Sequence, residues 1–475
     1  MKVFLGNAPW RSKDRLGVRA GSRWPMTLER GPYGNKVPVY LPFPFYLAYS
    51  AAVLGNLGHE VLLVDAIAEG ISEKEFVRRV DEFGPSLVLL ETSTPTINRD
   101  LEVVRRIRET RGDLSKLAVS GPHVTYMGEK FLNENKDIDF ILQGEYEYTL
   151  RDLIQALDGG AGDSSLAAVD GLIYRESSGA AKGNPRRPAI ENLDELPWPA
   201  YKYLPMYNYN DDCFGLEKPN VQMWASRGCP YNCVFCMWPD IMYGGHKYRT
   251  RDPIKVVDEM EWLLENYGFR GFYFDDDTFN IGKERMLKLC SEIKSRRLDT
   301  GWAAMARADT SDRETLAAMV DAGMVAIKLG VESAEQSLVD SCGKGLDLAK
   351  VEESIRNARE LGLRVHLTFT FGLPGETHES IQRTIDYAVS QDVFSVQFSI
   401  ATPFPGTKLF KNLDAEGRIL SKNWDDYDGN RKSVSRSENL SDKDLSDALE
   451  RAKCAWDSRK ATSKIPEEAL LLIGK

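Results

Sequence analysis

The sequence predicts an α/β protein with a doubly wound, Rossmann-like sheet first, a partial (βα)6 TIM-like barrel second and a helical C-terminal region last. Short apolar segments alternate with segments of helical period within residues 1–157, and again within 221–410. Residues 158–220 between them are rich in Gly, Ser, Pro and charge, as is typical of a linker. Residues 411–475 are charged and helix-like. A chain of 475 residues is long enough for this organisation.

Five strands are predicted in the first part. In a doubly wound sheet, ligands bind beyond the carboxyl ends of the strands. Those ends carry Glu91–Thr96, Ser120–Thr125 and Gln143–Glu147, whose small, polar or glycine residues would let a backbone approach a large ligand closely. Considered alone, these stretches are equally well explained as ordinary loops. The strands are Lys2–Gly6, Val61–Val64, Leu87–Leu90, Leu117–Ser120 and Phe140–Leu142.

Residues 7–45 interrupt this alternation as a long insertion that is rich in Arg, Gly, Pro and aromatic residues. Loops of such length inside a domain are usually functional or disordered. Trp10 and Trp24 favour ordered packing, over a cofactor or the substrate. In the linker, Gly171–Tyr174 and the turn-rich Ser177–Pro188 predict a small hairpin.

The second part repeats a strand–helix unit. Asp252 with Pro253 begins one helix and Gly268 ends it, Ser311 with Glu314 predicts a capping box for another, and Asp347 begins a third. In parallel barrels the functional residues lie at the carboxyl ends of the strands. The predicted strands are Val221–Ala225, Gly271–Phe274, Trp302–Met305, Ala326–Gly330, Val365–Phe371 and Ser395–Ile400.

Three cysteines, Cys229, Cys233 and Cys236, follow the first of these strands with the spacing C-x3-C-x2-C. Thiolates packed so closely repel one another unless a cation holds them, which indicates a metal. Structural zinc needs four protein ligands, and Cys213 and His246 are the only nearby candidates for a fourth. An iron–sulfur cube held by three cysteines leaves one iron open for a ligand, and the missing fourth ligand favours this reading.

Composition narrows the classes of function. A net charge of −10 argues against electrostatic binding of nucleic acid. No apolar run reaches the roughly 18 residues of a membrane span, and the stretch Met1–Gly6 is too short for a signal peptide. Seven cysteines, with three in one loop, indicate metal binding in a reducing cytoplasm and not a disulfide framework.

The cysteine loop, with Phe235 just before its last cysteine, resembles the signature of radical S-adenosylmethionine (SAM) enzymes. The resemblance implies a [4Fe-4S] cluster whose open iron chelates SAM, and reductive cleavage of SAM to a 5′-deoxyadenosyl radical. It also implies an external electron donor of the flavodoxin or ferredoxin type. At the strand ends it implies SAM contacts, although a solvated turn or helix cap explains Asp277 and Thr278 equally well. The implied contacts are Asp275, Asp276, Arg307, Glu332, Ser333 and Gly372.

Residues 1–157 resemble the cobalamin-binding domain that precedes many radical SAM barrels, through Gly58–Asp65, the Gly-Pro-His turn and Gly144–Glu147. The pattern D-x-H-x-x-G is absent, so a histidine ligand on cobalt is not expected. The connector Leu193–Ala200 and the run Pro403–Leu409 also match the family. The cobalamin contacts expected from the resemblance are Thr92, Ser93, Thr94, Pro95, Gly121, Pro122, His123, Gly144, Glu145 and Tyr146.

These resemblances imply a cobalamin-dependent radical SAM methyltransferase that methylates an unactivated carbon of a small-molecule or lipid substrate. One SAM would methylate cobalamin, and a second would give the radical that abstracts a substrate hydrogen. A cobalamin-dependent radical cyclase or rearranging enzyme is the first alternative. A non-catalytic cobalamin- or metal-binding protein is the second, and it makes the strand-end residues incidental. The sequence does not select a substrate.

Overall fold

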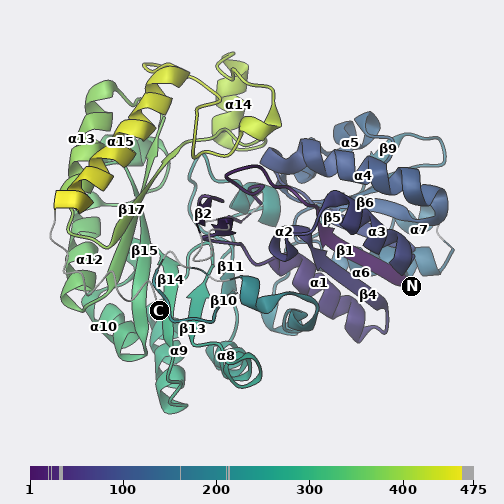
Figure 1. The fold of residues 1–475 in the computed structure, drawn as a ribbon, viewed down its shortest axis with the longest axis horizontal. Coiled ribbons are helices and arrows are strands. Elements are labelled where there is room, and N and C mark those ends of the chain that lie inside the picture. Colours follow the sequence, from purple (N-terminus) through teal and green to yellow (C-terminus); the bar gives the residue numbers. More distant parts are fainter. Residues whose placement is uncertain are drawn as a thin grey trace.

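The computed structural model describes residues 1–19, 21–22, 24–30, 36–160, 162–209, 211 and 214–462. Within these ranges the chain forms two large sheets with helices around them, the first mostly parallel and the second entirely parallel, together with two short two-stranded sheets. Figure 1 shows the N-terminal sheet beside the second one. The α/β class and the order of the two sheets predicted from the sequence are confirmed.

The N-terminal sheet has the strand order β4-β1-β5-β6-β7-β8-β9 in the described part of the chain. Neighbours are parallel as far as β7, and the last two strands run antiparallel. The order of the parallel strands reverses between β1 and β5, and such a switch point opens a crevice for ligands. The strands are β1 (Lys2–Asn7), β4 (Glu60–Asp65), β5 (Leu87–Glu91), β6 (Lys116–Ser120), β7 (Phe140–Leu142), β8 (Leu172–Arg175) and β9 (Ala181–Gly183).

Helices cover both faces of this sheet. Along β1, Phe4 packs edge-on against Phe76 of α3, with ring centroids 5.3 Å apart, while its neighbours Val3 and Leu5 face the other layer. This alternation follows from the period of two in a strand. Helices α1 and α6 contact each other, as do α3 and α4. The helices are α1 (Phe45–Asn56), α2 (Ala66–Glu69), α3 (Glu73–Phe83), α4 (Ile97–Arg111), α5 (Pro122–Glu134), α6 (Glu147–Asp158) and α7 (Asp163–Leu166).

Two segments accompany the N-terminal sheet, and the second of them extends it. The insertion leaves the end of β1 at the switch point and contains the antiparallel pair β2 (Leu28–Arg30) and β3 (Lys36–Pro38). The segment read as a linker contributes the hairpin β8–β9, which extends the N-terminal sheet beside β7. The boundaries 1–157, 158–220, 221–410 and 411–475 therefore stay a prediction.

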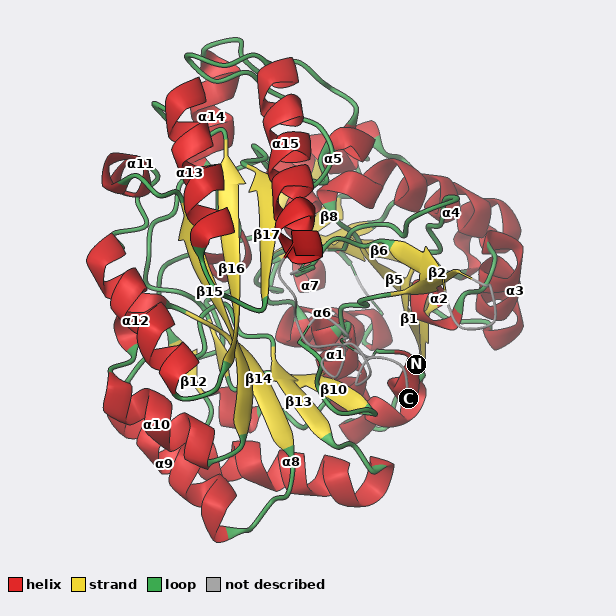
Figure 2. Ribbon diagram, turned by 60° about the vertical axis from the view of Figure 1, so that its left-hand side comes forward, coloured by secondary structure: helices red, strands yellow, loops and turns green. Residues whose placement is uncertain are grey.

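The second sheet follows the chain strictly, in the order β10-β13-β14-β15-β16-β17, and all of these described strands are parallel. Figure 2 shows its helices along the outer side of the curved sheet. The strands are β10 (Asn220–Met223), β13 (Gly271–Phe274), β14 (Gly301–Ala306), β15 (Met324–Glu332), β16 (Arg364–Phe371) and β17 (Ser395–Ile400); the short pair β11 (Ser226–Arg227) and β12 (Arg249–Thr250) lies apart. The helices are α8 (Pro253–Tyr267), α9 (Lys283–Ser295), α10 (Arg313–Asp321), α11 (Gln336–Ser341), α12 (Leu348–Glu360) and α13 (His378–Ser390).

Side chains at the helix ends explain these bounds. Asp252 accepts a hydrogen bond from the backbone N–H of Ile254, and Gly268 ends α8 in the left-handed conformation, as the sequence predicts. Asp347 caps α12 in the same way. The predicted capping box of Ser311 and Glu314 is wrong by one residue, because Asp312 accepts from the N–H of Thr315 and caps α10.

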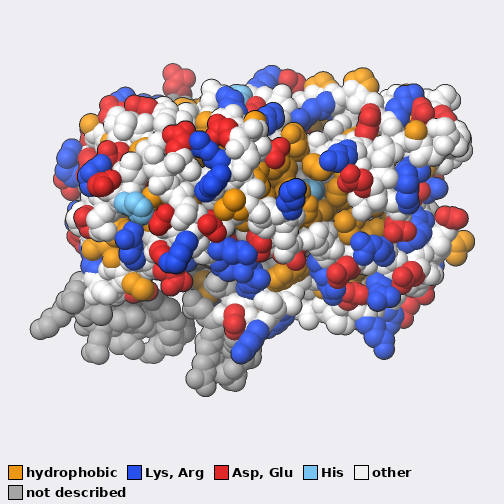
Figure 3. Space-filling model, turned by 90° about the horizontal axis from the view of Figure 1, so that it is seen from above, with side chains coloured by type: hydrophobic (Ala, Val, Ile, Leu, Met, Phe, Trp, Pro, Cys, Tyr) orange, Lys and Arg blue, Asp and Glu red, His pale blue; other side chains and the backbone are white. Residues whose placement is uncertain are grey.

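The C-terminal region forms α14 (Lys408–Ala415) and α15 (Asp442–Thr462). Helix α15 packs on α13 and on β17, so it covers the last strand of the second sheet. In the face seen in Figure 3, charges of both signs are interspersed and hydrophobic side chains gather toward the middle. None of the helices within the described residues combines the length and the apolar character that a membrane crossing requires.

Candidate functional site

The cysteine loop is held in one shape by its backbone. Gly228 begins the loop with φ +91°, and a Cβ there would lie 2.1 Å from the carbonyl oxygen of Lys247, so only glycine fits. Its N–H donates to Asp277 Oδ2 at 3.0 Å. Further along, the N–H of Val234 donates to the carbonyl of Cys342 at 2.8 Å. The π-helical turn Trp238–Tyr243 follows directly.

The three thiols fit a cluster with one open corner. Burial raises the pKa of Cys233 and of Cys236, and the proximity of Cys233 raises that of Cys236 further. Among the residues that the structure describes, no group of His, Cys, Asp and Glu is placed to hold a single metal ion. His246 bonds to the carbonyl oxygen of Tyr231 and to Asp240, and Cys213 lies outside the described residues. A loop that offers three thiols suits an iron–sulfur cube better than tetrahedral zinc.

The acidic end of β13 supports the loop that carries the thiols. Asp276 is fully buried, and its Oδ1 accepts from the N–H groups of Ala225 and Ser226 at 2.9 and 2.6 Å. Burial raises the pKa of Asp276 to about 6. Asp277 receives the Gly228 N–H and the hydroxyl of Tyr243, and the backbone carbonyl of Asp275 accepts from Trp224 Nε1. These contacts place Asp276 and Asp277 under the loop.

Arg307 follows β14 and lies against the loop. Its guanidinium is stacked 3.6 Å above the ring of Tyr231, which belongs to the cysteine loop. It donates to Asp309 and to the backbone carbonyls of Lys344 and Gly345 at 2.8 and 2.7 Å. The positive charge therefore lies next to the cysteine loop, and these hydrogen bonds of the guanidinium are all to other parts of the chain. The role of Arg307 as a SAM contact stays a prediction.

Glu332 ends β15 in a strained conformation. Its φ is +73°, in the region that favours glycine, and the pairing with β16 shifts register at this point. Its carboxylate accepts from Lys344 Nζ and from Thr370 Oγ1, both at 2.6 Å. The next residue, Ser333, faces away and lies 3.2 Å from Thr384 Oγ1. Of this predicted pair, only Glu332 points toward the second sheet's interior.

Gly372 turns the chain after β16 with φ +87°, and its N–H donates to the carboxyl group of Glu376. Glu376 is fully buried, and its Oε1 has no hydrogen-bond partner among the described residues. Burial raises the pKa of Glu376 to about 8 despite the donation from Gly372. The predicted glycine turn is thus built on a buried carboxyl group.

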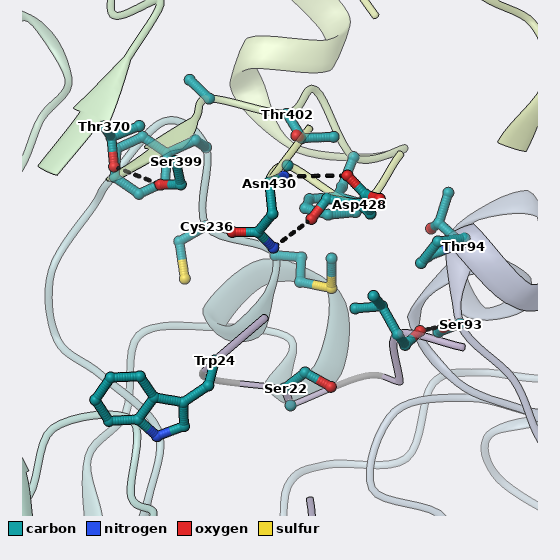
Figure 4. Close-up of a pocket in the computed structure, with 18 of the residues that line it drawn as sticks. Ser22, Trp24, Ser93, Thr94, Cys236, Thr370, Ser399, Thr402, Asp428 and Asn430 are labelled. Atoms are coloured by element: carbon teal, nitrogen blue, oxygen red, sulfur yellow. Dashed lines mark hydrogen bonds between the residues drawn. The ribbon is translucent and has the colours of Figure 1, made fainter. Parts of the chain in front are cut away.

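A cavity of about 340 Å³ lies between the two sheets. Phe235 and Cys236 of the cysteine loop line one side, and Figure 4 shows Cys236 on the same side of the cavity as Ser399 of β17, with Ser93, which follows β5, on the opposite side. The insertion and the segment 428–430 close the remaining sides. The lining residues predicted from the sequence are Ser93, Thr94, Pro95, Pro122, Phe235 and Cys236.

The end of β5 faces this cavity, whereas the ends of β6 and β7 are largely covered. Thr92 bonds to the carbonyl of Ser120, and a Cβ on Gly121 would meet the Thr92 carbonyl at 2.0 Å, so both residues pack against each other. His123 is buried edge-on against Trp424, with ring centroids 4.8 Å apart, and burial lowers its pKa to about 4. His123 does not line the cavity.

The turn Gly144–Glu147 contacts the short pair β11–β12, which flanks the cysteine loop in the sequence, through buried charges. Arg227, two residues before Cys229, donates to Glu145 at 3.1 Å and to Glu147 at 2.7 Å, and Arg249 donates to Glu145 at 2.7 Å. These four side chains are at most 2% exposed. Burial alone would raise the pKa of Glu145, but the two arginines lower it, while burial raises that of Glu147.

The other two predicted contacts of this turn also meet protein. The hydroxyl of Tyr146 donates to Glu91 Oε2 at 2.8 Å, and burial raises the pKa of Glu91 to about 7. A Cβ on Gly144 would lie 2.6 Å from the carbonyl of Met242. The structure therefore brings Glu145 and Tyr146 to an interface within the chain and not to the cavity.

Sequence reasoning missed several lining residues. Lys328, Gln397 and Thr368 come from strand interiors, where period-two patterning makes polar residues look solvent-facing. Arg19 of the insertion pairs with buried Asp65, which also accepts from the Tyr209 hydroxyl. The sequence did contain a signal for these residues. Polar residues alternate along neighbouring strands, and in a barrel one face of each strand points to the interior.

Comparisons with known proteins agree with this architecture. The Radical SAM superfamily model matches residues 225–388, and the B12 binding domain model matches residues 37–154. An uncharacterized methyltransferase of Pyrococcus horikoshii is 33% identical over 384 residues, which are 81% of this chain and 81% of that protein. The anaerobic magnesium-protoporphyrin IX monomethyl ester cyclase of Rubrivivax gelatinosus is 29% identical over 78% of this chain and 66% of its own length.

The fold is also found among solved structures. The cobalamin-dependent S-adenosylmethionine radical enzyme OxsB, with aqua-cobalamin and S-adenosylmethionine bound, gives a TM-score of 0.73 at 17% identity. The alignment covers 99% of this chain and 70% of that one. Three thiols on one loop, and a cavity between that loop and a doubly wound sheet, suit the [4Fe-4S] cluster, SAM and cobalamin. The chain therefore belongs to the cobalamin-binding radical SAM enzymes, which need a reductant and include both methyltransferases and cyclases.

Proposed function

We propose that this enzyme methylates an unactivated carbon of a small-molecule or lipid substrate. The observation that carries the proposal is the shared cavity. Cys236 and Phe235 of the cysteine loop line it from one side, and Ser93, Thr94 and Pro95 at the end of β5 line it from the other. A substrate held there would lie between the two cofactor regions.

When bound, the cofactors supply a hydrogen-abstracting radical and a transferable methyl group. Two SAM and two electrons from the reductant then yield a methylated substrate, S-adenosylhomocysteine, 5′-deoxyadenosine and methionine, which balances atoms and charge. A flavodoxin or ferredoxin is the expected electron donor.

The chain's own residues bind, orient and exclude water. We assign the cluster to Cys229, Cys233 and Cys236, whose loop is fixed by Gly228 and Asp277. Arg307 offers the fixed, planar cation that suits a carboxylate, and Glu332 offers a carboxylate braced by Lys344. On the other side, the hydroxyls and short side chains of Ser93 and Thr94 leave room for a large ligand. A bound substrate and bound cofactors would fill this cavity and leave less room for water beside a reactive species.

The test is anaerobic reconstitution of the full chain with iron, sulfide and cobalamin, followed by reductant and SAM, with both nucleosides measured by mass spectrometry. We expect 5′-deoxyadenosine and S-adenosylhomocysteine from the wild type and neither from Cys233→Ala. Cys290→Ala, which removes a buried thiol in α9, serves as the matched control and keeps both products. Absence of both nucleosides from cluster-loaded wild type would contradict the proposal.

A cyclase is the second candidate, supported by the relative from Rubrivivax gelatinosus. The same assay separates the two, because a radical cyclisation or rearrangement consumes no methyl group. Production of 5′-deoxyadenosine without S-adenosylhomocysteine would favour the cyclase.

A further inference from the structure

The segment 428–430 of the C-terminal region forms one side of the cavity. It is attached to β17, because the N–H of Ile400 donates to the carbonyl oxygen of Gly429 at 2.8 Å. Gly429 has φ +71°, and a Cβ there would lie 3.0 Å from Thr402 Oγ1, so the segment passes closely over this strand end. From α15, Lys453 Nζ donates to the carbonyl oxygen of Asn430 at 2.9 Å. These contacts fix the segment at the carboxyl end of the second sheet.

The side-chain amide of Asn430 has one orientation. Its Nδ2 donates to the carbonyl oxygen of Asp428 at 2.9 Å, and a carbonyl oxygen only accepts, so the amide nitrogen must lie on that side. Figure 4 shows Oδ1 directed instead toward the side of the cavity that carries Cys236. This oxygen is buried and has no hydrogen-bond partner among the described residues. Because a buried acceptor without a donor is unfavourable, Asn430 offers a place for a donor of a ligand.

Two hydroxyl groups of the neighbouring strands add further acceptors. The register pairs Thr370 of β16 with Ser399 of β17, and both line the cavity. Thr370 donates its hydrogen to Glu332 Oε2 at 2.6 Å. Ser399 Oγ lies 3.3 Å from the carbonyl oxygen of Phe369 and 3.3 Å from Thr370 Oγ1, so its hydrogen is also directed to the chain. A hydroxyl group has one hydrogen and two lone pairs, and the lone pairs remain for a ligand.

The charges around the cavity favour an uncharged donor. Among the described residues that line the cavity, Asp428 carries the sole carboxylate. That carboxylate accepts from Arg15 Nη1 at 3.3 Å and from Arg431 Nε, so it is already paired with two guanidinium groups. The SAM contacts implied by the resemblance, among them Arg307, do not line this cavity.

We propose that Asn430, Thr370 and Ser399 form an acceptor subsite that selects a substrate with a neutral hydrogen-bond donor, a hydroxyl group or an amide N–H. Asn430 is then a specificity-determining residue, because its Oδ1 is the acceptor whose direction the chain fixes most firmly. A donor held there would keep the substrate on the side of the cavity that carries Cys236. The inference rests on the proposed function, because it assumes that the cavity receives a substrate.

The experiment measures probe binding to the full chain loaded with cluster, cobalamin and SAM, without reductant, by isothermal titration. Cyclohexanol and cyclohexanecarboxamide carry a neutral donor, methoxycyclohexane carries only an acceptor, and cyclohexylamine carries a positive charge at neutral pH. We expect wild type to bind a neutral donor at least about fivefold more tightly than the ether, which is the factor that one neutral hydrogen bond supplies. Tighter binding of the amine than of both neutral donors would overturn the proposal.

Variants assign this preference to the Asn430 oxygen. Asn430→Leu removes the acceptor at similar volume, and we expect the preference for the neutral donor over the ether to fall to about twofold or less. Lys453→Met is the matched control, because it removes a contact of the Asn430 backbone and leaves the side-chain amide in place. It should keep the wild-type preference. An equal loss in both variants would overturn the proposal, as would an unchanged preference in Asn430→Leu. If Asn430→Leu fails to fold, Asn430→Ala replaces it and the same outcomes apply.

Cofactor binding distinguishes a substrate subsite from a cofactor contact. The SAM dissociation constant and the cobalamin content of Asn430→Leu should match those of wild type. A rise in the SAM dissociation constant of about tenfold or more, or the loss of most bound cobalamin, would assign Oδ1 to that cofactor and overturn the substrate subsite.

These results are independent of the methylation assay. If the wild type produces neither nucleoside, the proposed function fails regardless of probe binding. If it produces both nucleosides while Asn430→Leu keeps the wild-type preference among the probes, only the subsite fails.

Discussion

The cavity has two walls that differ in what their strand ends contact. On the second sheet, Arg307 at the end of β14 is stacked on Tyr231 of the cysteine loop. On the N-terminal sheet, the end of β5 reaches the cavity, but Glu145, Tyr146 and His123 bind other parts of the chain. A strand end is therefore a ligand site only where no other element of the chain already covers it.

The largest effect is expected at the buried ion pairs of the turn Gly144–Glu147, where the sequence predicted cobalamin contacts. Arg227→Met leaves Glu145 and Glu147 buried without one of their guanidinium partners, and we expect a loss of about 3–5 kcal/mol in the free energy of unfolding. Urea unfolding measures it. Arg270→Met, which removes an exposed pair with Glu217, should cost less than about 1 kcal/mol. Equal losses of unfolding free energy in the two variants would mean that the buried ion pairs of Arg227 contribute no more to stability than an exposed pair.

The next effect concerns the buried carboxyl group under the glycine turn. Because burial raises the folded-state pKa of Glu376 from 4.5 to about 8, the folded state binds the proton more tightly. Its stabilising contribution is complete below the unfolded pKa and is lost as pH rises to the folded pKa. Between about pH 6 and pH 9 we expect wild type to lose about 2–3 kcal/mol more than Glu376→Gln. Parallel pH profiles in urea unfolding would contradict this.

A smaller effect is expected at Arg307, the predicted SAM contact beside the cysteine loop. Arg307→Ala should raise the SAM dissociation constant at least about tenfold, which is about 1.4 kcal/mol, because a fixed guanidinium suits a carboxylate. Equilibrium dialysis with the cluster-loaded protein measures it. Arg313→Ala, at an exposed pair with Glu360, is the matched control. Unchanged SAM affinity in Arg307→Ala would assign the residue to the fold and support a non-catalytic cobalamin- or metal-binding protein.

The smallest effect is expected at His123. Since its ring packs on Trp424 and does not line the cavity, His123→Leu should leave the cobalamin content per chain and the absorption spectrum of bound cobalamin close to those of wild type. A loss of bound cobalamin, with a circular dichroism spectrum like that of wild type, would show that His123 contributes to cobalamin binding. It would also contradict the difference drawn between the two sides of the cavity.

Much of the fold could be predicted because its signals are local. Apolar alternation located the parallel strands of the two large sheets, and Asp252 and Asp347 marked helix starts. The spacing of three cysteines located the loop beside the cavity. Glu145 bonds to Arg227, 82 residues away, and Lys328 bonds to Gln397, 69 residues away. No local sequence pattern encodes such pairing.

The buried contact of Arg227 and Arg249 with Glu145 also bears on how the chain folds. Glu145 and Glu147 follow β7 of the N-terminal sheet and are at most 2% exposed, and their counter-charges lie on β11 and β12, in the later half of the chain. An excised N-terminal half would carry uncompensated charge in its interior. We therefore expect one cooperative unfolding transition for the whole chain. Neither half, expressed alone, should keep the structure that it has in the full chain.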